Sequence, residues 1–178
     1  CRNVESEHIT GNVFILEPDD LNHQQYLTGT SSSRMEFPYE VLPQDYTFIH
    51  VAKWISSSTG RIFNGLDYNW WSGFNEYYVT DVSAYHENWI TPVPGYTASA
   101  YVKDWIISTD QRSLYRANGE FKMSNDQNVG YQSHRYRIGL NTGKYPTNDE
   151  FERYGDWAVA EILVFDRELE PVEYKCIE

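Results

Sequence analysis

Short extended segments constrain this chain more than any other feature of its sequence. β-branched and aromatic residues recur in brief runs, and clusters of Gly, Pro, Asn, Asp and Ser separate these runs. The pattern predicts an all-β chain folded as an antiparallel β-sandwich, with a short C-terminal helical turn at residues 168–175. The runs predict strands at residues 12–16, 25–27, 34–37, 46–54, 61–63, 70–74, 82–90, 98–108, 113–117, 121–123, 136–140 and 157–165.

Two short segments carry specific local signals. In residues 134–140 the even-numbered positions share one face, while Arg135 and Arg137 project from the other, as in a half-buried strand. Asn118 and Gly119 separate two extended runs and suit a type I′ turn, because both central residues of that turn take positive φ. We therefore expect a two-residue hairpin at this position.

The last predicted strand contains one acidic residue between apolar neighbours. Strict alternation places Glu161 on the same face as Trp157, Val159, Leu163 and Phe165. A buried carboxylate is costly unless it is paired and hydrogen-bonded. We therefore expect a structural ion pair between Glu161 and a residue such as Arg135 or Arg137.

The composition excludes several classes of protein. The chain has 178 residues, and its 14 Lys and Arg against 26 Asp and Glu give a formal net charge of −12. Phosphate backbones repel such a chain, so no nucleic-acid partner is expected. Aromatic residues make up 16% of the sequence, which supplies the apolar area of a folded core. The length suits a single domain spanning residues 1–178.

Neither the apolar runs nor the first residue indicates a membrane segment or a targeting signal. The longest apolar runs, residues 13–16 and 162–165, are much shorter than the roughly 18 residues that a membrane-spanning helix needs. No membrane insertion is therefore expected. Because the sequence begins at Cys1 rather than Met, we expect a domain that is part of a larger multidomain protein.

The two cysteines, Cys1 and Cys176, lie at opposite ends of the sequence. A disulfide between them would close a very long loop and would stabilise the fold by roughly 5 kcal/mol in the chain-entropy model. We predict this bridge, and with it an oxidising compartment. Two free thiols at the chain ends are the alternative.

The second half of the sequence resembles a known family. The stretches that carry the resemblance are 104–107 (Asp-Trp-Ile-Ile), 113–119 (Ser-Leu-Tyr-Arg-Ala-Asn-Gly), 137–140 (Arg-Ile-Gly-Leu) and 155–169, which begins Gly-Asp-Trp-Ala-Val-Ala-Glu. Their order and spacing resemble those of the concanavalin A-like, laminin G-like jelly roll, over roughly residues 10–176. The resemblance implies that residues 104–107 form a core strand and that the last strand closes beside the N-terminus, as a Cys1–Cys176 bridge requires. The family includes lectins, adhesion modules and polysaccharide-cleaving enzymes, so the fold does not define the function.

The densest mixture of aromatic and polar residues spans 65–78 and suits sugar binding. A pyranose stacks its apolar face on Trp or Tyr and exchanges hydrogen bonds with Asn, Asp and Glu. Trp70 and Trp71 point to opposite faces of a strand, so we expect Trp70 and Phe74 in the core and Trp71 exposed. The candidate ligand-binding residues are Asp67, Asn69, Trp71, Asn75, Tyr77, Tyr78 and His86. An exposed aromatic patch can equally bind a protein.

Catalytic patterns are absent from the sequence. Glucan hydrolases of this fold resemble one another in carrying carboxylates that alternate along one strand, as in Glu-x-Asp-x-x-Glu, and this chain has no such run. It also lacks Gly-x-Ser-x-Gly and His-Glu-x-x-His. We therefore assign no catalytic residue and expect no enzyme.

Calcium is the one candidate cofactor. The resembling family often carries a calcium site, and oxygen-bearing residues cluster at 19–22, 125–128 and 148–150. Asp149 and Asp156 are the candidate ligands, although acidic loops are more often solvated turns.

These observations predict a non-catalytic, secreted or cell-surface module that binds a glycan or a cell-surface glycoprotein, with calcium as the candidate cofactor. A protein–protein adhesion or assembly module of laminin G type is one alternative. A divergent polysaccharide hydrolase or lyase is the other.

Overall fold

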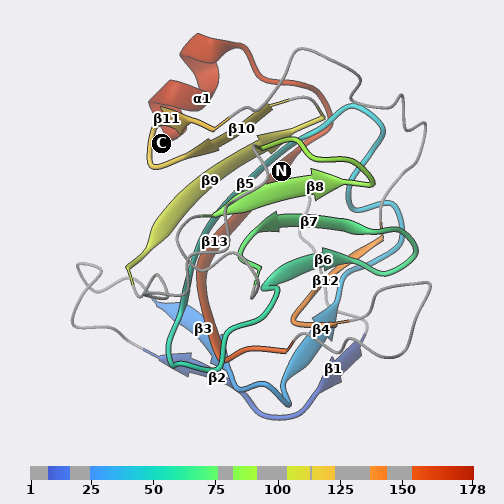
Figure 1. Cartoon of the computed structure of the whole chain (residues 1–178), viewed down its shortest axis with the longest axis vertical. Helices are drawn as coiled ribbons and strands as arrows, with labels where there is room; N and C mark the ends of the chain where they lie inside the picture. The colour runs from blue at the N-terminus through green and yellow to red at the C-terminus, as the bar shows by residue number, and fades with distance from the viewer. Residues whose placement is uncertain are drawn as a thin grey trace.

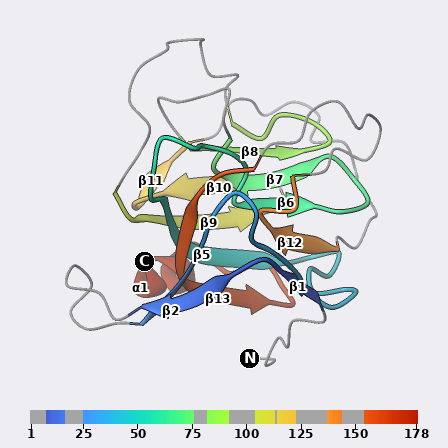
Figure 2. The ribbon, with the colours of Figure 1, turned by 90° about the horizontal axis from the view of Figure 1, so that it is seen from below.

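The chain folds into two antiparallel sheets that pack face to face (Figures 1 and 2). The computed structural model describes residues 8–16, 25–75, 82–91, 104–112, 114–122, 137–143 and 154–178. In spatial order, the first sheet contains β1 (His8–Thr10), β4 (Arg34–Glu36), β12 (Ile138–Leu140), β6 (Phe63–Gly65), β7 (Trp70–Gly73) and β8 (Ser83–His86). The second contains β11 (Glu120–Phe121), β10 (Leu114–Ala117), β9 (Ile106–Gln111), β5 (Thr47–Trp54), β13 (Trp157–Phe165), β3 (Tyr26–Gly29) and β2 (Val13–Leu16). The helix α1 (Pro171–Ile177) follows β13. The all-β sandwich with a short C-terminal helix is thus confirmed.

Most of the predicted strands and the hairpin agree with the structure, with shifts of a few residues at strand ends. The strand predicted at 98–108 is displaced: β9 begins at Ile106 and runs to Gln111, and residues 98–103 lie outside the described ranges. Asn118 and Gly119 have φ angles of 48° and 79°, and the flanking pairs are Arg116 with Phe121 and Ala117 with Glu120. The two-residue turn is therefore confirmed. The strand β1 was not among the predicted strands; it pairs with β4 at the edge of the first sheet.

Aromatic side chains fill the space between the sheets. The ring of Phe48 on β5 lies 5.1 Å from that of Phe63 on β6 and 5.9 Å from that of Trp70 on β7, measured between centroids. Trp70 and Phe74 are both fully buried, as predicted. Burial of these rings supplies the main driving force for packing the two layers.

A β-bulge in β13 overturns the prediction for Glu161. Val159 pairs with Ala52 of β5, but Glu161 pairs with Val51, so one residue is inserted between these two pairs. The insertion moves every later side chain of the strand to the opposite face. Glu161 is therefore exposed on the outer face of the second sheet, and the predicted interior ion pair is wrong. Arg137 instead pairs with Asp67, and Arg135 lies outside the described residues.

The exposure of Glu161 makes its carboxylate dispensable for folding. We expect that Glu161→Gln changes the free energy of unfolding by less than about 0.5 kcal/mol, as for an ordinary surface substitution. Urea denaturation compared with the unmodified chain would measure this change. A loss of several kcal/mol would show that the carboxylate has a buried partner.

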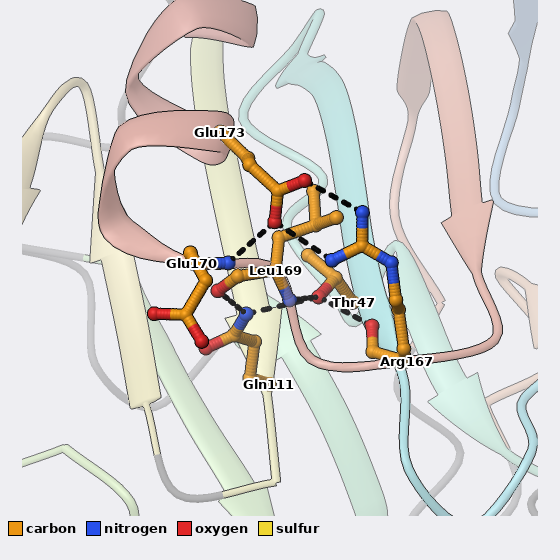
Figure 3. Close-up of polar contacts among 6 residues, drawn as sticks. All are labelled: Thr47, Gln111, Arg167, Leu169, Glu170 and Glu173. Carbon is orange, nitrogen blue, oxygen red and sulfur yellow. Dashed lines mark hydrogen bonds and ion pairs between the residues drawn. The ribbon is translucent and has the colours of Figure 1, made fainter.

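The segment between β13 and α1 is fixed to the second sheet by the hydroxyl of Thr47 (Figure 3). This hydroxyl donates to the carbonyl of Arg167 at 2.9 Å and accepts from the backbone N–H of Leu169 at 2.8 Å. The side-chain amide of Gln111 donates both to the Thr47 hydroxyl and to the carbonyl of Leu169, each at 2.9 Å. Two neighbouring strands, β5 and β9, therefore hold the chain as it enters the helix.

The helix α1 covers one end of the outer face of the second sheet. Tyr174 packs with Ile49 and Leu169 in a small apolar cluster. The guanidinium of Arg116 on β10 donates to both carboxylate oxygens of Glu178 at 2.9–3.2 Å, and both side chains are only 7% exposed. This bidentate pair connects the end of the helix to the sheet.

Only one of the two cysteines in the predicted disulfide lies within the described residues. Cys176 is exposed on α1 with a free thiol, whereas Cys1 lies outside the described residues. The Cys1–Cys176 bridge stays a prediction. Within the described part of the chain, no helix has the length and apolar character needed to cross a membrane.

Acid is expected to weaken the start of α1. Arg167 donates two hydrogen bonds to the carboxylate of Glu173, which also accepts from the backbone N–H of Glu170 at 2.8 Å (Figure 3). The hydrogen bonds from Arg167, followed by that from Glu170, lower the pKa of Glu173 from 4.5 to about 2.

A carboxyl group with a lowered pKa in the folded state stabilises the fold above its unfolded-state pKa and loses this effect as the pH falls through the folded value. The melting temperature of Glu173→Gln should therefore lie below that of the unmodified chain above pH 4.5, and the difference should shrink between pH 4.5 and about pH 2. A difference that stays constant over this range would contradict the assignment.

Candidate functional site

An aromatic cluster lies on the outer face of the first sheet. Because Trp70 points into the core, the next residue, Trp71, points outward. Its cross-strand neighbours are Asn64 on β6 and Tyr85 on β8. The rings of Trp71 and Tyr85 stack with centroids 4.5 Å apart and planes within 6° of parallel.

The guanidinium of Arg61 lies over the ring of Trp71, with its central carbon 4.1 Å from the ring centroid. Arg61 also donates to the side-chain oxygen of Asn69 at 3.2 Å. Arg61 comes from the β6 side of β7, whereas Tyr85 comes from the β8 side, so Trp71 is held between the two. The side chain of Trp71 is 3% exposed, and the prediction that it is exposed is wrong.

Trp89 completes the aromatic cluster and forms its accessible part together with Tyr85. Its ring meets those of Trp71 and Tyr85 edge to face, at 5.5 Å and 5.2 Å. A short turn after β8 brings it there: Glu87 takes a positive φ of 57°, and Tyr85 and Trp89 form an isolated bridge. Tyr85 and Trp89 are half-buried, and we call these two residues the outer platform.

Neither ring of the outer platform was among the predicted ligand-binding residues. A partial signal was present, because Trp71 occupies an outward position once Trp70 is assigned to the core. Which strands are neighbours could not be read from alternation alone. The pairing of β7 with β8 turns two separate outward aromatics into one cluster.

Polar side chains lie on the same sheet as the cluster. Asp67 accepts a hydrogen bond from Arg137 at 3.1 Å, and both side chains are about 40% exposed. Asn69 is half-buried beside Arg61, and Asn88 is exposed in the turn between the two platform rings. The structure therefore brings the predicted residues Asp67, Asn69 and Trp71 to one part of the first sheet.

Other predicted ligand-binding residues do not lie on this face. The ring of His86 points into the sandwich, where it stacks on Trp70 and its Nε2 lies 3.1 Å from a carboxylate oxygen of Asp110 on β9. Asn75 is buried as well, with 1% of its surface exposed. Tyr77 and Tyr78 lie outside the described residues, so their part in binding stays a prediction.

The interior contains a serine–histidine pair that resembles a nucleophile and its base. The hydroxyl of Ser72 lies 3.0 Å from Nε2 of His50, which comes from the opposite sheet. Both side chains are fully buried, and burial lowers the pKa of His50 to about 3. A substrate on the outer surface cannot reach this hydroxyl. The pair therefore connects the two layers as a structural hydrogen bond.

One of the two candidate calcium ligands has a structural role. The carboxylate of Asp156 accepts from the backbone N–H of Ser31 and from the hydroxyl of Ser56, each at 2.7 Å. Asp156 thereby fastens two loops to the start of β13. Asp149 lies outside the described residues, and the described ranges contain no group of three or more His, Cys, Asp or Glu side chains placed to hold a metal ion.

Solved structures of other proteins are similar to this chain, whereas sequence comparisons find no match. The sequence matches no protein-family model and no curated protein. Domain 4 of AbnA, an extracellular GH43 arabinanase from Geobacillus stearothermophilus solved in complex with arabinotriose, has a TM-score of 0.56 at 14% identity, covering 94% of this chain and 81% of that chain. The receptor-binding domain of the botulinum neurotoxin C/D mosaic serotype has a TM-score of 0.56 at 11% identity, covering 98% of this chain.

A structure of botulinum neurotoxin type C is also similar, with a TM-score of 0.52 at 11% identity, and cell entry of that toxin depends on two ganglioside molecules. The present chain spans 46% of each of these two toxin chains. A Trypanosoma rangeli sialidase variant with trans-sialidase activity has a TM-score of 0.51 at 9% identity. At such low identities these similarities establish a shared β-sandwich fold.

The enclosed position of Trp71 gives it a structural role beneath the outer platform. Trp71→Ala would remove the ring that stacks on Tyr85 and the cation–π contact with Arg61. We expect the free energy of unfolding to fall by about 3–5 kcal/mol. Chemical denaturation would measure this loss. A fall below about 1 kcal/mol would show that the ring is accessible rather than enclosed.

Proposed function

We propose that this chain is a non-catalytic, extracellular glycan-binding module of the concanavalin A-like type, and that a sugar ring stacks on the outer platform. The observation that carries this proposal is the pair of accessible rings, Tyr85 and Trp89, set edge to face at 5.2 Å. A pyranose presents C–H groups on one face, and these pack against the face of an aromatic ring.

The buried ring of Trp71, which lies beneath the outer platform, favours binding. Trp71, held between Arg61 and Tyr85, fixes the orientation of the Tyr85 ring before any ligand arrives. A site that is already ordered loses less conformational entropy when it binds. The rigid inner ring therefore contributes to affinity without touching the sugar.

The margin of the platform supplies hydrogen-bonding groups for sugar hydroxyls. Asn88 is exposed between the rings, and its side-chain amide, whose oxygen accepts from the backbone N–H of Trp89 at 3.3 Å, is placed to exchange hydrogen bonds with a sugar. The partly exposed Asp67–Arg137 pair lies on the same sheet. Aromatic faces and such polar edges are the two components that a sugar site requires.

The structural neighbours agree with this proposal in the kind of ligand they bind. One is a domain solved with arabinotriose, and another belongs to a toxin whose cell entry depends on gangliosides. We infer that the partner is a glycan or a cell-surface glycoprotein, and that the module belongs to a larger secreted or surface protein. Calcium assistance is a separate part of the proposal, which a chelator tests.

A glycan array tests the outer platform directly. We expect the unmodified chain to be retained on a subset of oligosaccharides, and Tyr85→Ala to weaken that retention at least tenfold, which corresponds to about 1.4 kcal/mol. Tyr85→Phe keeps the ring and should retain binding. Phe121→Ala removes an exposed ring at the far edge of the second sheet and serves as the matched control.

Melting temperatures measured alongside would show that each variant is folded. Retention of folded Tyr85→Ala at the unmodified level would reject the platform, and an array without any retained glycan would favour a protein partner. The same array with a chelator separates calcium-dependent from calcium-independent binding.

A further inference from the structure

A second group of aromatic residues lies on the opposite side of the sandwich. On the outer face of the second sheet, Phe14, Thr28, Ala158 and Lys53 are successive neighbours across β2, β3, β13 and β5. Trp105 immediately precedes β9, beside Lys53, and Tyr26 lies two residues before Thr28 on β3. These side chains come from five different strands or strand ends.

Two rings of this group meet above a small residue. The centroids of Tyr26 and Trp105 are 5.3 Å apart, and their planes are inclined at 74°. Ala158 lies on a strand between them and is completely buried, although it belongs to an outer face. The two large side chains therefore lean toward each other across the sheet, and the small side chain of Ala158 leaves them room.

The ammonium of Lys53 holds the two rings together. It lies 4.4 Å from the centroid of Trp105 and 5.9 Å from that of Tyr26, within the range of cation–π attraction. Tyr26, Lys53 and Trp105 are all half-buried, and Phe14 beside them is 54% exposed. We call Tyr26, Lys53 and Trp105 the second platform.

The second platform is separate from α1 and from the outer platform. Lys53 is four residues along β5 from Ile49, which the helix covers, and this spacing corresponds to roughly 13 Å along a strand. The outer platform lies on the other sheet, so the whole sandwich separates the two groups of rings.

We propose that the second platform is a further carbohydrate site, which accepts a neutral sugar residue on the rings of Tyr26 and Trp105. Two half-buried aromatic rings leave a small apolar area, which suits one sugar unit. A stable protein interface needs about 800 Å² on each partner, which is more than these rings offer.

Charge favours a neutral sugar over an acidic one. The chain carries a net charge of −12, which repels carboxylated or sulfated glycans at a distance. The Lys53 ammonium is drawn to the ring faces, where it orients Tyr26 and Trp105 and donates hydrogen bonds to sugar hydroxyls at their edge. Binding at this platform should therefore depend little on salt.

Two platforms on opposite faces would allow one chain to hold two glycans at once. Because the two platforms face opposite directions, the two glycans would belong to different molecules or surfaces, so the chain would bridge them rather than bind one surface more tightly.

The indole N–H resonances of the tryptophans report on the two platforms separately. The probes are arabinotriose, N-acetyllactosamine and sialyllactose, titrated into the full chain labelled with ¹⁵N-tryptophan. The variants Trp105→Phe and Trp89→Phe each assign one resonance. We expect a neutral sugar to shift the Trp105 resonance in a saturable manner. Tyr26→Ala, which keeps Trp105, should weaken this shift at least fivefold, whereas Tyr85→Ala should leave it unchanged.

The outcomes distinguish this inference from the proposed function. A Trp105 resonance that no probe moves overturns the second platform, whatever the resonance of Trp89 does. A shift of the Trp105 resonance without a shift of the Trp89 resonance supports the second platform and counts against the outer platform. A shift caused by sialyllactose alone, and abolished by salt, would overturn the preference for neutral sugars.

Discussion

The packing of aromatic rings between two sheets is the interaction on which the rest of this structure depends. Phe48, Phe63 and Trp70 come from both layers and meet at centroid distances of 5.1–5.9 Å. Since side chains alternate along a strand, a ring that enters this core sends its neighbours to the outer surface. Trp70 inside thus requires Trp71 outside, and Tyr85 on β8 and Tyr26 on β3 likewise lie on outer faces.

Buried polar groups connect the same two layers. His50 with Ser72 and His86 with Asp110 each join one sheet to the other inside the sandwich. Histidine, serine and aspartate are residue types that often act in catalysis. These four side chains are buried between the sheets, where a hydrogen-bonded polar group fixes how the two layers align.

Much of the fold could be predicted because its signals are local. The Asn118–Gly119 turn follows from the positive φ that both positions adopt, and strand positions follow from short apolar runs bounded by turn residues. The face of Glu161 could not be predicted in this way. A single inserted residue at the bulge reverses the alternation, and the sequence does not mark where a partner strand leaves one residue unpaired.

In the candidate site, too, some features follow from the sequence and others from tertiary contacts. Sequence alone determined that this chain is a β-sandwich, that Trp70 faces the core and that Trp71 faces away from it, because these depend on residue type and on alternation along one strand. Tertiary structure decided that Arg61 and Tyr85 enclose Trp71, that Tyr85 and Trp89 form the accessible rings, and that Tyr26 meets Trp105. Each of these contacts joins residues from different strands. Which strands become neighbours is set by the packing of the whole chain, and no local pattern encodes it.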